Sequence, residues 1–269
     1  MVVSPKFPVL QAPSASPSPS HPPKTPPAAP PPFIDIVLGI DGTASRKWLN
    51  PEGSNSHVYR FVQQMRCGEN GGYLHGPGDL GLDVANIVNA GVQWISERVT
   101  AAAAPRASSY GGLNQSSFLS LSDVFVRLSL VGHSRGGLIA ILIAKRLRNF
   151  KVCPRISGMH LHFLGLYDAV DWHLGPYADV IPGNVSSAYH ALRDPTVCSR
   201  TWFGNTGTKA ETPCRYTSRL FTATHSGVGG DPWKGDKPSQ INEQIDILGS
   251  AQVGNWMMNM AKSEGLPMK

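Results

Sequence analysis

The sequence lacks the signatures of a metal site, of a membrane span and of a cleaved leader. Its four cysteines, Cys67, Cys153, Cys198 and Cys214, form no C-x-x-C pair, which argues against a structural zinc site. No apolar run approaches the roughly 20 residues that cross a bilayer. Residues 1–8 lack the uninterrupted apolar core of a signal peptide. We therefore expect no metal, no cofactor and a cytoplasmic location. Export without a cleaved signal peptide remains open.

The charge of the chain is only mildly one-sided. The formal net charge is +6, from 24 basic and 18 acidic side chains. The basic residues are scattered and do not cluster with aromatic ones, so we expect no nucleic-acid partner. An ordinary basic surface and a peripheral contact with anionic membrane lipid both remain open.

The first 32 residues differ in composition from the rest. They hold 12 of the 23 prolines, no acidic residue and no periodic apolar face. This composition predicts a disordered, proline-rich arm over residues 1–32, which is either a solvated tail or a ligand for a protein partner. Residues 33–269 then form one domain that is long enough to bury a large core.

Strand-like and helix-like segments alternate along residues 33–269. The apolar spacing predicts strands at 34–40, 124–131, 158–165 and 218–224. It predicts helices at 57–66, 83–95, 135–149 and 240–262. A turn cluster is expected at 73–78, a loop at 104–122 and an irregular stretch at 172–215. The alternation indicates an α/β fold, with a mostly parallel central sheet and helices on both faces.

A short glycine motif is the most informative feature of the chain. Gly132, His133, Ser134, Arg135 and Gly136 stand between a strand-like run and an apolar helix-like run. The two glycines remove side chains where strand and helix crowd together, which is the setting of a nucleophilic serine. The helix start adds backbone N–H groups and a positive dipole end. Ser134 is the predicted nucleophile, and a Gly-rich turn without a catalytic role is the alternative.

A nucleophilic serine needs a base, and the base needs an acid that orients it. Asp168 directly follows a strand-like run and therefore lies at the sheet edge where α/β active sites form. We predict that it is the acid. Asp171 is a nearby competitor, and a turn or helix-cap role is the alternative for Asp168.

The base is expected after the last strand. His225 follows the strand-like run 219–224 and precedes a glycine-rich segment, so we predict a catalytic histidine on a flexible loop. The other later histidines are His173 and His190. A solvated loop histidine is the alternative for His225. His133, inside the glycine motif, is interpreted as a packing residue.

Two backbone donors are expected to form the oxyanion hole. The first is the N–H of Arg135, the residue after the predicted nucleophile. The second is expected from the loop after the strand 34–40, at Gly42 or Thr43. An ordinary Asp-Gly turn is the alternative reading of this loop.

Four segments, taken in order, resemble a single protein family. They read GIDGT at 39–43, GHSRG at 132–136, FLGLYDAV at 163–170 and HSGVGG at 225–230. They resemble the α/β-hydrolase family that includes type VI secretion phospholipase effectors and many uncharacterised bacterial relatives. The segments 190–194, with Phe203, and 256–267 are also similar to that family. The resemblance implies an α/β-hydrolase catalytic domain over 33–269, with Ser134 as nucleophile, Asp168 as acid and His225 as base.

The expected activity is acyl transfer from a carboxylic ester to water, on an ester or lipid substrate. A lipase- or phospholipase-like esterase is favoured. A thioesterase or peptidase with the same triad remains open, as does an inactive scaffold that binds a protein partner through its proline-rich arm. The segments 44–80 and 172–215 are expected to form the pocket walls. Four aromatic residues there would either line an acyl site or belong to the core: Trp172, Tyr177, Trp202 and Phe203.

Overall fold

The computed structural model describes residues 33–43, 56–103, 125–153, 156–171, 180–197, 199, 204–235 and 241–269. Several expectations concern residues outside these ranges. They are the proline-rich arm, the loop at 104–122, His173 and the four aromatic residues of the expected pocket walls.

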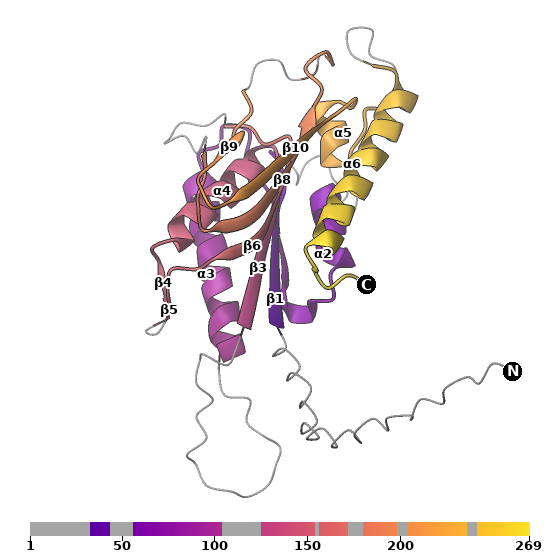
Figure 1. Cartoon of the computed structure of the whole chain (residues 1–269). Helices are drawn as coiled ribbons and strands as arrows, with labels where there is room; N and C mark the ends of the chain where they lie inside the picture. Colours follow the sequence, from indigo (N-terminus) through magenta and orange to yellow (C-terminus); the bar gives the residue numbers. More distant parts are fainter. Residues whose placement is uncertain are drawn as a thin grey trace, which may run out of the picture. The chain divides into compact units, whose positions relative to one another are not determined.

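A six-stranded sheet forms the centre of residues 33–269 (Figure 1). Its strands, in spatial order, are β10 (Arg215–Phe221), β8 (Val185–Arg193), β6 (Leu161–Tyr167), β3 (Phe125–His133), β1 (Phe33–Ile40) and β2 (Gly71–Leu74). Every neighbouring pair in this sheet is parallel. The carboxyl ends of all six strands therefore meet at one edge, and the segments that follow them are brought together there.

Helices cover both faces of the sheet (Figure 1). On one face lie α3 (Val84–Ala103) and α4 (Arg135–Leu147), and on the other lie α2 (His57–Gln64), α5 (His225–Gly229) and α6 (Glu243–Ser263). The pleat of β1 shows why both faces need cover, because successive side chains point to opposite sides. Leu38 packs into the core beneath α3 and α4, whereas Val37 packs into the core beneath α2 and α6. None of the helices in the described ranges combines the length and apolar composition that crossing a bilayer requires.

The remaining elements are short. They are the 3-10 helix η1 (Gly68–Asn70), the antiparallel pair β4 (Lys151–Cys153) and β5 (Ile156–Ser157), and the parallel pair β7 (Val180–Ile181) and β9 (Lys209–Ala210). The predicted fold class is confirmed: a parallel central sheet carries helices on both faces.

Two local predictions were wrong. The stretch 172–215 was expected to be irregular, but it contains β8, which lies inside the sheet between β6 and β10. Two of the side chains that β8 buries completely, Ser187 and His190, are polar, so the strand lacks a plain apolar pattern. The segment 73–78 was expected to be a turn, but its first two residues form the end of β2. The sequence of β2, GGYL, contains too few apolar residues to be recognised as a strand.

Candidate active site

Ser134 occupies a sharp turn between β3 and α4. Strand β3 ends at His133 and helix α4 begins at Arg135, which leaves Ser134 alone between them with φ 55° and ψ −128°. A positive φ costs a residue with a side chain roughly 1–3 kcal/mol and persists only where the surroundings enforce it. Two backbone hydrogen bonds enforce it here. The Ser134 N–H donates to Tyr167 O at 3.0 Å, and the Val170 N–H donates to Ser134 O at 3.2 Å.

The two glycines of the motif are required by close backbone approach. A Cβ atom on Gly132 would lie 2.4 Å from the carbonyl oxygen of Gly136. A Cβ atom on Gly136 would lie 2.3 Å from the carbonyl oxygens of Ile40 and Asp41. Strand β3, helix α4 and the end of β1 therefore meet without room for a side chain, as the sequence motif predicts.

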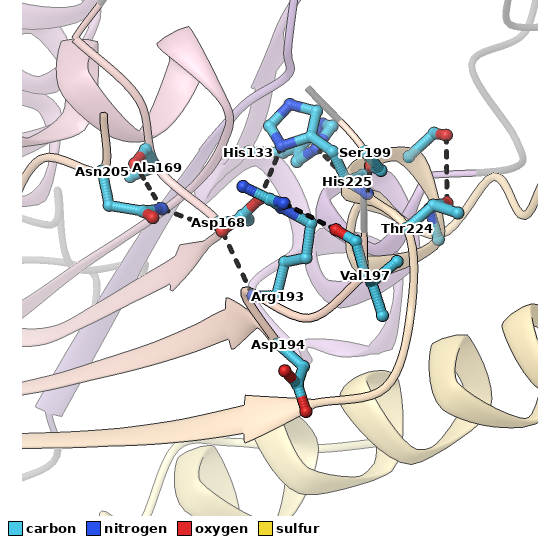
Figure 2. A network of polar contacts seen from close by, with 12 residues as sticks. His133, Asp168, Ala169, Arg193, Asp194, Val197, Ser199, Asn205, Thr224 and His225 are labelled. Carbon is cyan, nitrogen blue, oxygen red and sulfur yellow. Dashed lines mark hydrogen bonds and ion pairs between the residues drawn. The ribbon is translucent and has the colours of Figure 1, made fainter. Parts of the chain in front are cut away.

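Asp168 and His225 lie side by side and are joined by a short hydrogen bond (Figure 2). The Nδ1 atom of His225 is 2.6 Å from Oδ2 of Asp168, and both side chains are almost fully buried. Asp168 directly follows β6, where Tyr167 pairs with His133 of β3. The parallel register therefore places the carboxylate next to the turn that holds Ser134.

Three further donors surround the carboxylate of Asp168 (Figure 2). Its Oδ1 atom accepts hydrogen bonds from Asn205 Nδ2 at 2.8 Å and from the Arg193 N–H at 3.2 Å. Arg193 Nε also lies 3.5 Å from Oδ2. Burial alone would raise the pKa of Asp168, but the hydrogen bonds from His225, Asn205 and Arg193 outweigh it and hold the pKa well below its ordinary value. The carboxylate is therefore ionised at neutral pH.

His225 is the first residue of a short helix, whereas the sequence predicted a flexible loop. Thr224 caps this helix, α5, by accepting the Gly227 N–H on its hydroxyl at 2.9 Å. The His225 N–H donates to Ser199 Oγ at 2.7 Å. Because Asp168 is an ionised acceptor, the Nδ1 atom of His225 carries the proton and Nε2 is the basic atom of the neutral ring. The candidate base is therefore positioned by a capped helix and not by glycine flexibility.

The three predicted triad residues gather at the carboxyl edge of the sheet. Ser134 follows β3, Asp168 follows β6 and His225 follows the segment after β10. The ring of His133, next to Ser134, lies 4.8 Å from the ring of His225 between centroids. Within the described part of the chain, the buried Oγ atom of Ser134 makes no hydrogen bond.

The competing residues have other contacts. His190 is fully buried, accepts the Ala169 N–H on Nε2 at 3.0 Å and donates from Nδ1 to Gly207 O at 3.2 Å. Burial lowers the pKa of His190 to about 4, so the ring is neutral and supports the backbone beside Asp168. The carboxylate that bonds to His225 is that of Asp168, three residues before Asp171.

The loop after β1, which carries the predicted second oxyanion donor, lies beside Ser134. A Cβ atom on Gly42 would lie 3.1 Å from Cβ of Ser134, so this loop borders the predicted nucleophile. The Gly42 N–H, however, donates to Asp41 Oδ1 at 2.8 Å, which argues against its predicted role. Thr43 is held by its hydroxyl, which accepts a hydrogen bond from Arg135 Nε. Arg135 and Thr43 therefore remain the candidates for the two backbone donors.

The α/β fold of the chain, with its parallel central sheet, resembles that of solved structures. An uncharacterized protein from Pseudomonas aeruginosa matches 89% of it with a TM-score of 0.55 and 16% sequence identity. The Tle1 effector bound to the VgrG spike of the type 6 secretion system matches 78% with a TM-score of 0.42 and 14% identity. The chain spans 47% and 54% of these two proteins. The RedJ thioesterase from Streptomyces coelicolor matches 87% of the chain, over 91% of its own length, with a TM-score of 0.34 and 15% identity. No protein-family model and no curated protein sequence matches the chain.

Sequence reasoning missed several residues that hold this candidate site together. Asn205 and Ser199 come from segments without a motif, and neither carried a signal in the sequence. Arg193 lay within the segment 190–194 that resembles the family, which was a usable signal. His133 was interpreted as packing, yet it contacts the backbone of His225.

Proposed function

We propose that the protein is a serine hydrolase that cleaves carboxylic esters through Ser134, His225 and Asp168. The observation that carries the proposal is the buried 2.6 Å hydrogen bond between His225 and Asp168, beside a serine held at positive φ. An ionised acid, a histidine with Nδ1 protonated and a serine on a strand-to-helix turn are the parts of a nucleophilic triad.

In the proposed reaction, Nε2 of His225 takes the proton of Ser134 as Oγ attacks the ester carbonyl carbon. The carbonyl π bond breaks and its electrons form the oxyanion. Asp168 keeps the imidazole oriented and stabilises its charged form. The oxyanion collapses, the C–O bond to the alcohol breaks, and His225 gives its proton to the leaving alkoxide. Water, activated by the same histidine, then cleaves the acyl-enzyme and restores Ser134.

Backbone N–H groups of Arg135 and Thr43 would stabilise the oxyanion. Loss of one such donor typically costs about 3 kcal/mol of transition-state stabilisation. The side chain of Arg135 supports this arrangement, because Nε donates to the Thr43 hydroxyl and Nη2 donates to Asp79 O at 2.8 Å. Arg135 thereby links the start of α4 to both neighbouring loops.

Two exposed leucines favour a lipid-like ester. Leu80 and Leu82 are 70% and 72% exposed and lie on the loop after β2, next to the Asp79 carbonyl that Arg135 binds. Large apolar side chains on the rim of a site are suited to contact aggregated acyl chains. The motif resemblance to phospholipase effectors supports the same substrate class.

The first experiment is intact-mass measurement after treatment with a fluorophosphonate ester, on the wild type and on Ser134→Ala. We expect one adduct on the wild type and none on the variant. p-Nitrophenyl esters and then phospholipids would follow as substrates. A folded wild type that forms no adduct, with and without detergent micelles, would overturn the proposal in favour of an inactive scaffold.

A further inference from the structure

The ring of His133 touches both the base and the loop that borders the nucleophile. Its Nε2–H donates to the carbonyl oxygen of His225 at 3.1 Å, since a carbonyl can only accept. Its Nδ1 atom faces Oδ1 of Asp41 at 3.8 Å. Figure 2 shows His133 and His225 next to each other. One side chain therefore spans from α5 to the loop after β1.

Two glycines leave room for this ring. A Cβ atom on Gly42, in the loop after β1, would lie 2.7 Å from Nδ1 of His133. A Cβ atom on Gly229, in α5, would lie 2.3 Å from Cε1 of the same ring. Both distances are too short for real carbon contacts, so the ring fills the whole space between the two backbones. The thickness of the ring sets how far α5 stands from the loop.

A buried carboxylate fixes the loop side of this contact. Asp41 accepts the Gly42 N–H on Oδ1 at 2.8 Å and the Tyr73 hydroxyl on Oδ2 at 2.7 Å. Burial would raise the pKa of Asp41, but contacts with His133, Ser56 and Tyr73 outweigh it and lower the pKa below its ordinary value. Asp41 thus fixes the loop, through Gly42 and Tyr73, on the side of the ring opposite His225.

We propose that His133 is a positioning residue for ester hydrolysis, which keeps His225 and the loop of Gly42 and Thr43 at a fixed separation around Ser134. The inference rests on the proposed function. Displacement of a catalytic group by about 1 Å can cost roughly 100-fold in rate. The position of His225 matters for proton transfer and hardly for substrate binding. Loss of the ring therefore lowers kcat and leaves KM nearly unchanged.

The test compares His133→Leu with His162→Leu. The His162 ring also donates from Nε2 to a backbone carbonyl, that of Glu264 at 2.8 Å, but it lies at the amino end of β6, away from Asp168. We would measure the rate of Ser134 labelling by the fluorophosphonate, and kcat and KM on p-nitrophenyl butyrate. We expect His133→Leu to lose about 100-fold in labelling rate and in kcat, with KM within about threefold of wild type. His162→Leu should match the wild type.

A conservative variant separates positioning from folding. The side-chain amide of His133→Gln can donate to the same carbonyl, so we expect it to recover kcat to within about tenfold of wild type. Should His133→Leu fail to fold, Gly229→Ala decides, because it keeps the ring and displaces it, and it should also lower kcat. A folded His133→Leu or Gly229→Ala protein that is labelled at the wild-type rate overturns the inference about His133 but not the proposed function. A wild type that is not labelled overturns the proposed function, and the inference with it.

Discussion

The carboxylate of Asp246 binds both hydrogen-bond donors of Thr224: its oxygens accept the Thr224 N–H at 2.7 Å and the Thr224 hydroxyl at 2.7 Å. Asp246 is fully buried in α6, and it also accepts the Trp233 N–H at 2.9 Å. Thr224 directly precedes His225 and caps α5. The long C-terminal helix is therefore tied to the candidate base through one buried carboxylate.

We predict that Asp246→Asn destabilises the protein and slows it. An amide has only one acceptor oxygen, so at least one buried donor loses its partner, which costs about 2 kcal/mol in the free energy of unfolding. Because α5 carries His225, kcat should fall as well. Urea titration and ester turnover would measure the two effects. Glu97→Gln, on an exposed face of α3, is the control and should change the free energy of unfolding by less than about 0.5 kcal/mol. Equal stability of Asp246→Asn and wild type would refute the prediction.

Substitutions of Asp168 and of its hydrogen-bond donor Asn205 should differ strongly in their effect on kcat. Asp168→Asn removes the charge that orients and stabilises the His225 imidazolium, so we expect kcat to fall about 10⁴-fold. Asn205→Ala removes one of several donors to the carboxylate, and we expect a loss of about tenfold, equivalent to about 1.4 kcal/mol. Steady-state kinetics on a p-nitrophenyl ester would separate them.

The control for this pair is Asn89→Ala, an exposed position on α3 for which no loss is expected. A loss on Asn205→Ala as large as that on Asp168→Asn would mean that Asn205 has a direct role that the geometry does not suggest. No loss on Asp168→Asn would contradict the proposed triad.

The positions of Ser134 and Asp168 at strand ends could be predicted from the sequence because each depends on local signals. Ser134 stands between two strongly apolar runs, and Asp168 ends a third. Parallel topology then brings strand ends together without further information. Strand β8 gave no such signal, because its buried Ser187 accepts a hydrogen bond from Arg215 and its buried His190 bonds to the backbone.

The partners of Asp168 and His225 depend on tertiary contacts. Asn205 reaches Asp168 across 37 positions of the chain, and Asp246 reaches Thr224 across 22. Such contacts leave no periodicity or short motif. The Gly42 N–H, by contrast, bonds locally to the side chain of the preceding residue, Asp41. The positions of the candidate residues at strand ends could therefore be predicted, whereas the hydrogen-bond network around them could not.

Leu80 and Leu82 should matter for aggregated substrates only. If these exposed side chains contact acyl chains at a lipid surface, the double variant Leu80→Ser/Leu82→Ser should lose at least about tenfold in activity on micellar long-chain esters. Full burial of one leucine contributes roughly 1.5–3 kcal/mol, and tenfold corresponds to about 1.4 kcal/mol. Activity on dissolved p-nitrophenyl butyrate should stay unchanged.

Phe33→Ser is the matched control for the leucines. Phe33 is 48% exposed but begins β1, at the edge of the sheet opposite the candidate site. It should leave both activities unchanged. Equal losses on micellar and dissolved esters would show that the leucines support the site itself and do not bind lipid.

Acidification should destabilise the protein well before its carboxylates are protonated. Burial and the neighbouring Arg60 cation lower the pKa of His57 to about 3, and burial lowers that of His190 to about 4. In the unfolded chain both histidines have a pKa of about 6.5. Below that pH these two histidines bind protons in the unfolded state but stay neutral in the folded state. Each histidine therefore reduces the free energy of unfolding by up to about 1.4 kcal/mol per pH unit between pH 6.5 and its folded pKa.

Asp168 affects the free energy of unfolding in a lower pH range. Because its pKa is depressed in the folded state, its contribution is fully present above the unfolded value of about 3.9 and is lost only below it. Urea titrations at pH 7.5, 6.0 and 5.0 therefore isolate the histidines. We expect wild-type stability to fall across this series, and the fall to be about halved in His57→Gln, whose amide can still donate to Ser250 O as His57 Nε2 does. Substitution of the exposed His160 by Gln should leave the fall unchanged. Constant wild-type stability from pH 7.5 to 5.0 would mean that neither buried ring resists protonation.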